Sequence, residues 1–338
     1  MRHLASYIIT RVLLAIPMVF IMLTLVFVVL RIMPGDPVSA MLGGHAPQKV
    51  IDEKKEMLGL NKPLIVQYGE YLGKLVRLDL GESMIFTQKV SQPILEKLPA
   101  TLELTLFGLL ASLGIGIPLG AYAAQRRRTT RDYGIRLYAN VVYCIPVFWL
   151  GLLLQLIFGV FLGWFPISGR TGPRMQASGF SWSGFYIVDT LRVGNLAAFA
   201  DVLWHLVLPA VTLGVVLSGI FVRLTRANML DVLKSDYILA ARARGIPERK
   251  VVYDHGLRNA LIPIVTMLGL QFSLLLAGAI LTESTFSWPG MGRLLLERIY
   301  LRDYPTIQGV IVVYTLFVSG MSLLVDLLYA VIDPRVKY

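Results

Sequence analysis

The sequence predicts an all-α membrane protein with several membrane-spanning helices, and composition and apolar run length carry this prediction. Of the 338 residues, 56% are hydrophobic and only 16% are charged, and the mean hydropathy is +0.66. Soluble domains average about 45–50% apolar and about 25% charged residues, so a soluble chain of this composition would expose large apolar patches. Many of the apolar residues are gathered into runs of about 20, the length that a helix needs to cross a bilayer. A disordered chain is excluded as well, because disorder requires low hydrophobicity.

Six apolar segments are long enough to cross the membrane. The first, residues 12–30, lies between Arg11 and Arg31. No small-residue cleavage pattern follows it, so we expect an anchor that is not removed. The other five segments cover residues 104–124, 137–165, 203–222, 261–281 and 309–332. Six spans place both termini on the same side of the membrane.

The distribution of Lys and Arg predicts which side this is. If the N-terminus is cytoplasmic, the inner segments carry 17 basic residues in about 65 positions, and the outer segments carry 15 in about 136. The short loop 125–136 alone contains five arginines, and short loops decide orientation under the positive-inside rule. We therefore expect both termini in the cytoplasm. We attribute the net charge of +11 to basic loops that lie at the surface of the lipid bilayer. No nucleic-acid partner is expected.

These spans divide the chain into three parts. Residues 1–30 are expected to form an N-terminal transmembrane helix, and residues 31–100 an extracytoplasmic region. Residues 101–338 form a core of five further transmembrane helices, which includes the cytoplasmic loop 223–258.

The extracytoplasmic region is expected to be a small helical cap. It opens with Pro-Gly-Asp-Pro at residues 34–37, which predicts a turn because proline cannot continue a helix. The amphipathic stretches at 47–58 and 63–77 then predict two short helices.

The second predicted span carries a small residue at every fourth position, namely Ser112, Gly116, Gly120 and Ala124. These residues share one face of a helix and form a smooth ridge, which lets two helices approach closely in lipid. We expect the ridge to pack against another span. A position in the wall of a transport pathway is the alternative.

The cytoplasmic loop 223–258 predicts two short helices joined by a tight corner. Ser235 or Asp236 can cap the first helix, Gly245 supplies a left-handed stop, and Pro247 can begin the second helix. Four residues at helical spacing are expected to share one face: Tyr237, Ala240, Ala241 and Arg244. A basic corner with small residues suits insertion into a cleft of another protein. A solvated loop that only fixes the topology is the alternative.

The same loop carries a family resemblance. Asp-Tyr-Ile-Leu-Ala-Ala-Arg-Ala-Arg-Gly at 236–245, followed by Leu-Arg-Asn-Ala-Leu-Ile-Pro at 257–263, resembles the cytoplasmic "EAA" loop of ABC-importer permease subunits. Leu239 stands where that motif has its glutamate. Motifs along nearly the whole chain resemble the dipeptide, oligopeptide and nickel permease family, and they lie at residues 33–37, 58–63, 79–83, 98–104, 146–151, 286–292, 303–305 and 333–335. Residues 168–170 and 188–190 are most similar to the dipeptide branch.

The resemblance implies a type I ABC-importer permease in a bacterial or archaeal cell (inner) membrane. Its partners would be a second homologous permease subunit, two cytoplasmic ABC ATPase subunits and an extracytoplasmic substrate-binding protein. The implied cargo is a dipeptide or short oligopeptide, with nickel or another small cargo as the alternative. The corner at 240–247 would be the coupling helix, with the ATPase-coupling residues Asp236, Tyr237, Ala240, Ala241, Arg242, Arg244, Gly245, Ile246 and Pro247.

No residue pattern predicts catalysis, a metal or a cofactor in this chain. A G-x-x-x-x-G-K-S/T loop and an H-E-x-x-H motif are both missing from the sequence. The four histidines are scattered, and Cys144 is the single cysteine. We therefore expect a transporter subunit without enzymatic activity, with ATP hydrolysis carried out by partner subunits. An intramembrane hydrolase that uses Ser319 or Ser322 with His205 is a remote alternative.

Polar residues at membrane depth are candidates for the transport pathway. Gln271 and Ser273 lie nearest the middle of the fifth span, and Asp326 lies within the sixth. Glu283 and Trp288, near the outer end of the fifth span, are candidates for an outer gate or a binding-protein contact. For the span residues the alternative is hydrogen bonding that only supports packing. A secondary transporter, the competing transport mechanism, would need coupling charges at the midplane, where Asp326 alone is available and lies off-centre.

Overall fold

The computed structural model describes residues 2–32, 38–39, 46–57, 59–173 and 182–332. Within these residues the regular structure is helical, apart from one isolated bridge between Glu82 and Lys89. The helices are α1 (Arg2–Ile32), α3 (Gln48–Met57), α4 (Leu64–Val76), α5 (Ser91–Gln125), α6 (Thr130–Cys144), α7 (Val147–Leu154), the π-helix η1 (Gln155–Phe161), α9 (Tyr186–Val193), α10 (Leu196–Val232), α11 (Asp236–Ala243), α12 (Glu248–Lys250), the π-helix η2 (Val251–Leu257), α13 (Arg258–Ala260), α14 (Ile262–Thr285), α15 (Met291–Tyr300) and α16 (Tyr304–Ile332).

The helices confirm the prediction of a polytopic membrane protein. Within the described residues, α1, α5, α10 and α16 are each long and apolar enough to cross a membrane without interruption. Two bent helix pairs, α6 with α7–η1 and α12–α13 with α14, raise the possible number of spans to six. The predicted six spans are therefore the highest count that the structure supports.

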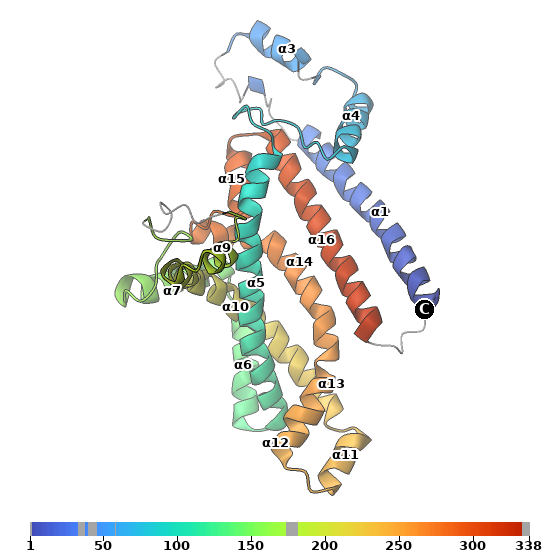
Figure 1. The fold of residues 1–338 in the computed structure, drawn as a ribbon, viewed down its shortest axis with the longest axis vertical. Coiled ribbons are helices and arrows are strands. Elements are labelled where there is room, and N and C mark those ends of the chain that lie inside the picture. The colour runs from blue at the N-terminus through green and yellow to red at the C-terminus, as the bar shows by residue number, and fades with distance from the viewer. Residues whose placement is uncertain (1, 33–37, 40–45, 58, 174–181, 333–338) are drawn as a thin grey trace.

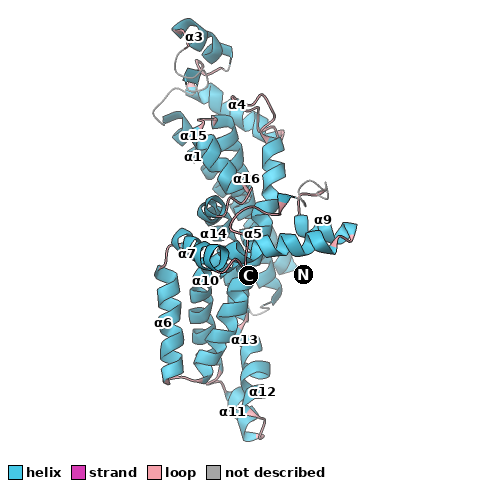
Figure 2. Ribbon diagram, turned by 90° about the vertical axis from the view of Figure 1, so that its left-hand side faces the viewer, coloured by secondary structure: helices cyan, strands magenta, loops and turns pink. Residues whose placement is uncertain are grey.

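The predicted third span, 137–165, is not one continuous helix. It divides into α6 and α7–η1, whose axes differ by 102°. The division lies at Ile145 and Pro146, whose ψ angles of 126° and 130° are extended. A proline disfavours the helical conformation of the residue before it, which explains why the helix stops here. Figure 2 shows α7 and α9 lying across the long helices.

The two longest helices, α5 and α10, pack directly against each other through the predicted ridge of small residues. A Cβ atom added to Gly116 would lie 2.5 Å from Cβ of Phe221, and one added to Gly120 would lie 2.7 Å from Cβ of Thr225. From the opposite side, a Cβ atom on Gly214 would lie 2.5 Å from that of Ala111. The ridge prediction is confirmed, because only hydrogen fits at these three glycines.

The long helices separate two ends of the molecule, which we call the α4 end and the α11 end (Figure 1). The α4 end carries α3 and α4, which confirm the helices predicted at 47–58 and 63–77. The turn predicted at 34–37 lies outside the described residues. The first residues of α1 and the last residues of α16 both point away from the α4 end (Figure 1).

We predict that Gly120→Ala destabilises the fold whereas Gly114→Ala, on the same helix, does not. The added methyl group at Gly120 meets Thr225 and the backbone oxygen of Val222 at 2.7 Å, whereas nothing lies within 4 Å of a Cβ atom at Gly114. Overpacking costs about 1–3 kcal/mol, while alanine in an open helix position is favoured by up to about 1 kcal/mol. Thermal unfolding of the purified variants in detergent checks this, and equal midpoints for the two variants would contradict it.

Candidate functional site

A tight corner, residues 235–251, follows α10 at the α11 end. Gly245 has φ +74°, a left-handed conformation that favours glycine. Its amide donates to the carbonyl of Arg242 at 2.9 Å, and the amide of Ile246 donates to the carbonyl of Ala241 at 3.3 Å. These two bonds form the Schellman arrangement that ends a helix. Pro247 is the N-cap residue of α12, so the predicted stop and restart of the helix are both confirmed.

A small apolar core makes this corner a firm unit. The core consists of the buried residues Ile238, Ala241 and Val251, with Ile246 packed against them. On its exposed side, Arg242 donates two hydrogen bonds to the carboxylate of Glu248, at 2.7 and 3.1 Å. The pair therefore links the two arms of the corner across its exposed side.

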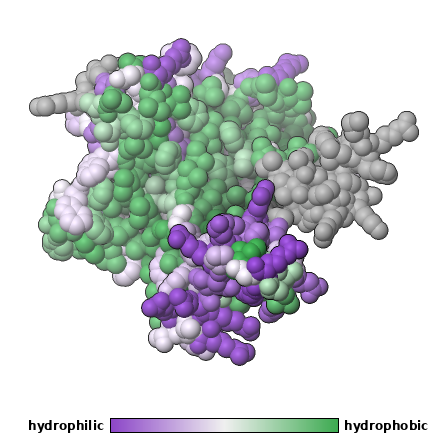
Figure 3. Space-filling model, turned by 60° about the horizontal axis from the view of Figure 1, so that its bottom comes forward, coloured by the Kyte–Doolittle hydropathy of each residue, from purple (hydrophilic) through white to green (hydrophobic). Residues whose placement is uncertain are grey.

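The outer face of α11 is exposed. Tyr237 is 45% exposed, and Ala240 and Arg244 are exposed beside it. Ala241, which was expected on the same face, is buried in the corner's core and offers no surface to a partner. Figure 3 shows that hydrophilic residues gather at this end, below a broad hydrophobic surface.

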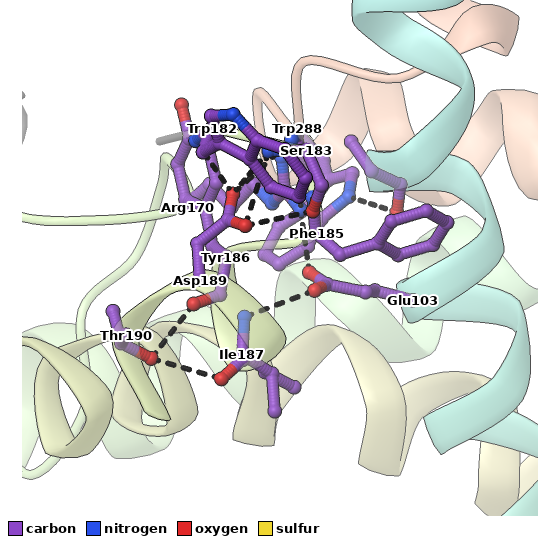
Figure 4. A network of polar contacts seen from close by, with 12 residues as sticks. Glu103, Arg170, Trp182, Ser183, Phe185, Tyr186, Ile187, Asp189, Thr190 and Trp288 are labelled. Atoms are coloured by element: carbon purple, nitrogen blue, oxygen red, sulfur yellow. Dashed lines mark hydrogen bonds and ion pairs between the residues drawn. The ribbon is translucent and has the colours of Figure 1, made fainter. Parts of the chain in front are cut away.

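A buried ion pair joins helix α5 to the segment that connects η1 with α9 (Figure 4). Nη2 of Arg170 lies 2.6 Å from Oε2 of Glu103 on α5, and both side chains are nearly inaccessible. Arg170 also donates to the carbonyl of Gly184 and lies 3.7 Å from the ring centroid of Tyr186. Oε1 of Glu103 accepts a hydrogen bond from the amide of Ile187. We call these residues the Glu103–Arg170 cluster.

The carboxylate of Asp189 orders the loop before α9. It accepts hydrogen bonds from the hydroxyl of Ser183 and from the amides of Trp182, Ser183 and Gly184. Burial alone would raise the pKa of the Asp189 carboxyl, but these hydrogen bonds together hold its pKa below the ordinary value. The ionised group thus fixes the loop that supplies Gly184 to Arg170.

The turn between α14 and α15 is tied to the start of α5 by a second polar group. Oε1 of Glu283 accepts a hydrogen bond from the hydroxyl of Thr101 at 2.6 Å, and Oε2 accepts one from the amide of Arg293. The hydroxyl of Thr101 in turn accepts from the amide of Met291, and Nε1 of Trp288 donates to the carbonyl of Ala100. We call this arrangement the Glu283 turn.

Glycine is required at two positions of the Glu283 turn because the Glu283 carboxylate and the backbone of Ile280 occupy the space of a side chain. A Cβ atom on Gly290 would lie 2.2 Å from Oε1 of Glu283, and one on Gly292 would lie 2.7 Å from Cα of Ile280. Glu283 and Trp288 are both fully buried. Neither side chain is therefore on the surface of this structure, and their role at an outer gate or in a binding-protein contact stays a prediction.

The predicted pathway residues of α14 are buried. Gln271 is 5% exposed and Ser273 is 7% exposed. Oε1 of Gln271 and Oγ of Ser273 have no hydrogen-bond partner among the described residues. Asp326 lies in α16, but its side chain is outside what the structure describes. The polar residues Thr101, Glu103 and Arg170 were given no role by the sequence, although each lies in or beside a motif quoted above.

The family models match the chain over most of its length. Residues 116–338 match the model described as binding-protein-dependent transport system inner membrane component, and residues 4–105 match the model of its N-terminal part. The chain belongs to this family. It is therefore a transport permease with several membrane spans, which confirms the family predicted from the motifs.

Known permeases resemble the chain from end to end. It is 43% identical to the dipeptide transport system permease protein DppB of Alkalihalophilus pseudofirmus, covering 98% of this chain and 99% of the relative. It is 41% identical to the di/tripeptide transport system permease protein DppB of Pseudomonas aeruginosa over the same shares. It is 38% identical to the oligopeptide transport system permease protein AppB of Bacillus subtilis, over 99% of this chain and 100% of the relative.

We predict that Arg170→Gln destabilises the permease far more than Arg293→Gln. Removing Arg170 leaves the carboxylate of Glu103 buried without its cation, which costs about 3–5 kcal/mol. Arg293 pairs with Glu297 on the surface, where both side chains are about half exposed, and such pairs contribute at most about 1 kcal/mol. Thermal unfolding in detergent measures the difference.

The double variant Glu103→Gln/Arg170→Gln provides the control. It removes both charges, so its unfolding midpoint should lie above that of Arg170→Gln alone. A double variant that is less stable than the single one would contradict this assignment.

Proposed function

We propose that this permease is the transmembrane subunit of an ATP-driven importer of dipeptides or short oligopeptides. The observation that carries the proposal is similarity over 98% of the chain to a dipeptide permease at 43% identity. The proposed assembly contains a second, homologous permease, two cytoplasmic ATPase subunits and an extracytoplasmic binding protein, in a bacterial or archaeal cell membrane.

The α11 end is proposed to be cytoplasmic, with both chain termini on that side. Three observations support this orientation. Basic residues are densest in the loops predicted to be inside. The start of α1 and the end of α16 both point away from the α4 end (Figure 1). The exposed polar corner projects beyond the hydrophobic surface at the α11 end (Figure 3).

We propose that the α11–α12 corner fits into a groove of one ATPase subunit. Tyr237, Ala240 and Arg244 present an exposed face on which Ala240 allows close approach. The Schellman turn and the small core keep the corner's shape when it is pushed. Closure of the ATPases would then move it as a rigid body.

The corner has a packed route into the spans. Met229 at the end of α10, Val252 of η2 and Ala260 of α13 form one buried cluster with Ala121 and Ala124 of α5. A displacement of the corner would therefore shift α5, α10 and the start of α14 together. Such a shift changes access to the pathway only if the contacts of the two states differ.

The polar groups toward the α4 end are proposed to hold the outer side of the pathway. The Glu283 turn fixes α15 against the start of α5, and the Glu103–Arg170 cluster fixes the loop before α9 against the same helix. Gln271 and Ser273 are proposed to line the pathway, because their buried polar atoms lack partners in the part of the chain that the structure describes.

The cargo is tested by uptake into vesicles that contain the assembled transporter. Labelled dipeptide should accumulate only with ATP and the binding protein, and longer peptides or nickel should compete poorly. Uptake of nickel without uptake of peptide would show that nickel, and not a peptide, is the cargo. Peptide uptake by the permease alone under a proton gradient would overturn the ATP-driven mechanism.

We predict that Ala240→Asp weakens binding of the ATPase and lowers peptide uptake without unfolding the permease. Residue 240 is exposed, so the carboxylate costs nothing in the free subunit, but it would be buried without a partner in the ATPase groove. Loss of about 1–3 kcal/mol at this contact reduces assembly by about fivefold to about 150-fold. Peptide uptake and co-purification of the ATPase are the measurements.

Ala197→Asp is the matched control for this substitution. It introduces the same side chain at an exposed alanine in the first turn of α10, far from the corner, where an acidic residue is favourable. Its uptake should remain within about twofold of the unmodified permease, because about 0.4 kcal/mol corresponds to this factor. Equal loss in the two variants would mean that the corner has no special role.

A further inference from the structure

A polar pocket of about 560 Å³ lies at the α4 end. It is lined by the last turn of α1, residues 59–60, one face of α4, the loop 79–89 and the first turns of α16. Its volume falls in the range of pockets that hold small ligands, about 300–1,000 Å³. We call it the α4 pocket.

Two spans independently place the α4 pocket at the edge of the hydrocarbon layer. The apolar run of α1, residues 12–30, lies between Arg11 and Arg31, and at 1.5 Å per residue this run spans about 28 Å, close to the hydrocarbon thickness of about 30 Å. Arg31, directly after this run, lines the pocket. Helix α16 begins at Tyr304, and Pro305 and Gln308, just before the span predicted from residue 309, line the pocket from that side. The pocket therefore lies at the depth of the lipid headgroups.

The pocket is also next to lipid. Only 17% of the apolar window of α1 is buried within the chain. Of its neighbours, α16 makes the most extensive contact with α1, and α4 adds an aromatic contact through Tyr68, whose ring lies 5.2 Å from that of Phe27. A lipid beside α1 therefore has its headgroup at the mouth of the pocket.

The lining combines positive and negative charge in equal number. Arg31, Lys74 and Lys89 are the cations, and Glu70, Asp79 and Glu82 are the acids. Glu70 pairs with Lys62, whereas Lys74, Lys89 and Glu82 form no ion pair among the described residues. An anion alone would meet three carboxylates, and a cation alone would meet three basic groups, so this charge pattern matches a ligand that carries both charges.

Buried polar atoms in the lining also lack partners. Gln67 is 8% exposed, and its Nε2 donates to the carbonyls of Leu60 and Lys62. Its Oε1 and the Nε of Arg31 have no hydrogen-bond partner in the described part of the chain. Buried polar atoms are normally satisfied, so the lining of the pocket is not fully satisfied by the described residues.

We infer that the α4 pocket binds the headgroup of a zwitterionic phospholipid that carries a primary ammonium group. The phosphate lies with Arg31 and the two lysines, because guanidinium and ammonium groups form strong hydrogen bonds to phosphate. The ammonium lies with the carboxylates, and the acyl chains follow the apolar surface of α1. A free dipeptide carries the same pair of charges, but the depth of the pocket and the neighbouring lipid favour the headgroup.

Native mass spectrometry of the delipidated full chain tests the inference. Phosphatidylethanolamine should bind at least about tenfold more tightly than phosphatidylglycerol, which lacks the ammonium, since one charged hydrogen bond accounts for such a factor. Phosphatidylcholine, whose quaternary nitrogen has no N–H donor, should bind more weakly as well. Equal binding of the three lipids would overturn the proposal, and this comparison requires no variant.

The variants Lys74→Gln and Glu82→Gln locate the site. Both residues are exposed at the pocket, so neither change removes a buried group, and each should lower phosphatidylethanolamine binding at least about threefold. Arg77→Gln, an exposed cation at the end of α4 that does not line the pocket, is the matched control and should leave binding unchanged. Equal effects of Lys74→Gln and Arg77→Gln would overturn the assignment of the site.

A competition experiment distinguishes a bound lipid from a bound peptide. Glycylglycine at millimolar concentration should not displace phosphatidylethanolamine from the chain. Displacement that is lost in Lys74→Gln would identify the peptide as the occupant and overturn the lipid assignment. None of these measurements involves the ATPases, so their outcome is independent of the proposed transport mechanism.

Discussion

The close contact between α5 and α10 is the constraint on which the remaining structure depends. Gly116, Gly120 and Gly214 bring the two backbones so near that no side chain fits between them. Helices in lipid gain little from hydrophobic burial against each other, so close packing of small residues holds them together. Since α5 and α10 are the two longest helices, their alignment fixes where the opposite ends of the molecule lie.

Each end of this helix pair carries one of the regions for which we propose a function. The start of α5 supplies Thr101 and Glu103, which bind the Glu283 turn and the loop before α9. The end of α10 leads into the α11–α12 corner, and Met229 packs it against the lower part of α5. A change in the angle between α5 and α10 would therefore be felt at both ends, which is what a transporter with alternating access requires.

The two ends are stabilised by different interactions. At the corner, the Arg242–Glu248 pair is exposed on both sides, so it adds at most about 1 kcal/mol, and the Schellman turn with its small core sets the shape. At the Glu103–Arg170 cluster the charges are buried, and each depends on the other to avoid an unpaired charge. The shape of the corner thus depends little on the exposed ion pair, whereas the buried cluster can separate only if its charges find new partners or water.

The sequence by itself determined the helical class, the α3 and α4 helices, the small-residue ridge and the stop at Gly245, because each depends on local residue spacing or on a backbone conformation that few residues adopt. The motifs also identified the family. The tertiary structure decided what depends on residues far apart in the chain: the bend at Pro146, the burial of Ala241, Glu283 and Trp288, and the pairing of Glu103 with Arg170, 67 residues later. Hydropathy measures how apolar a segment is, but the direction in which a polar side chain points and the partner that it meets are set only when the helices pack.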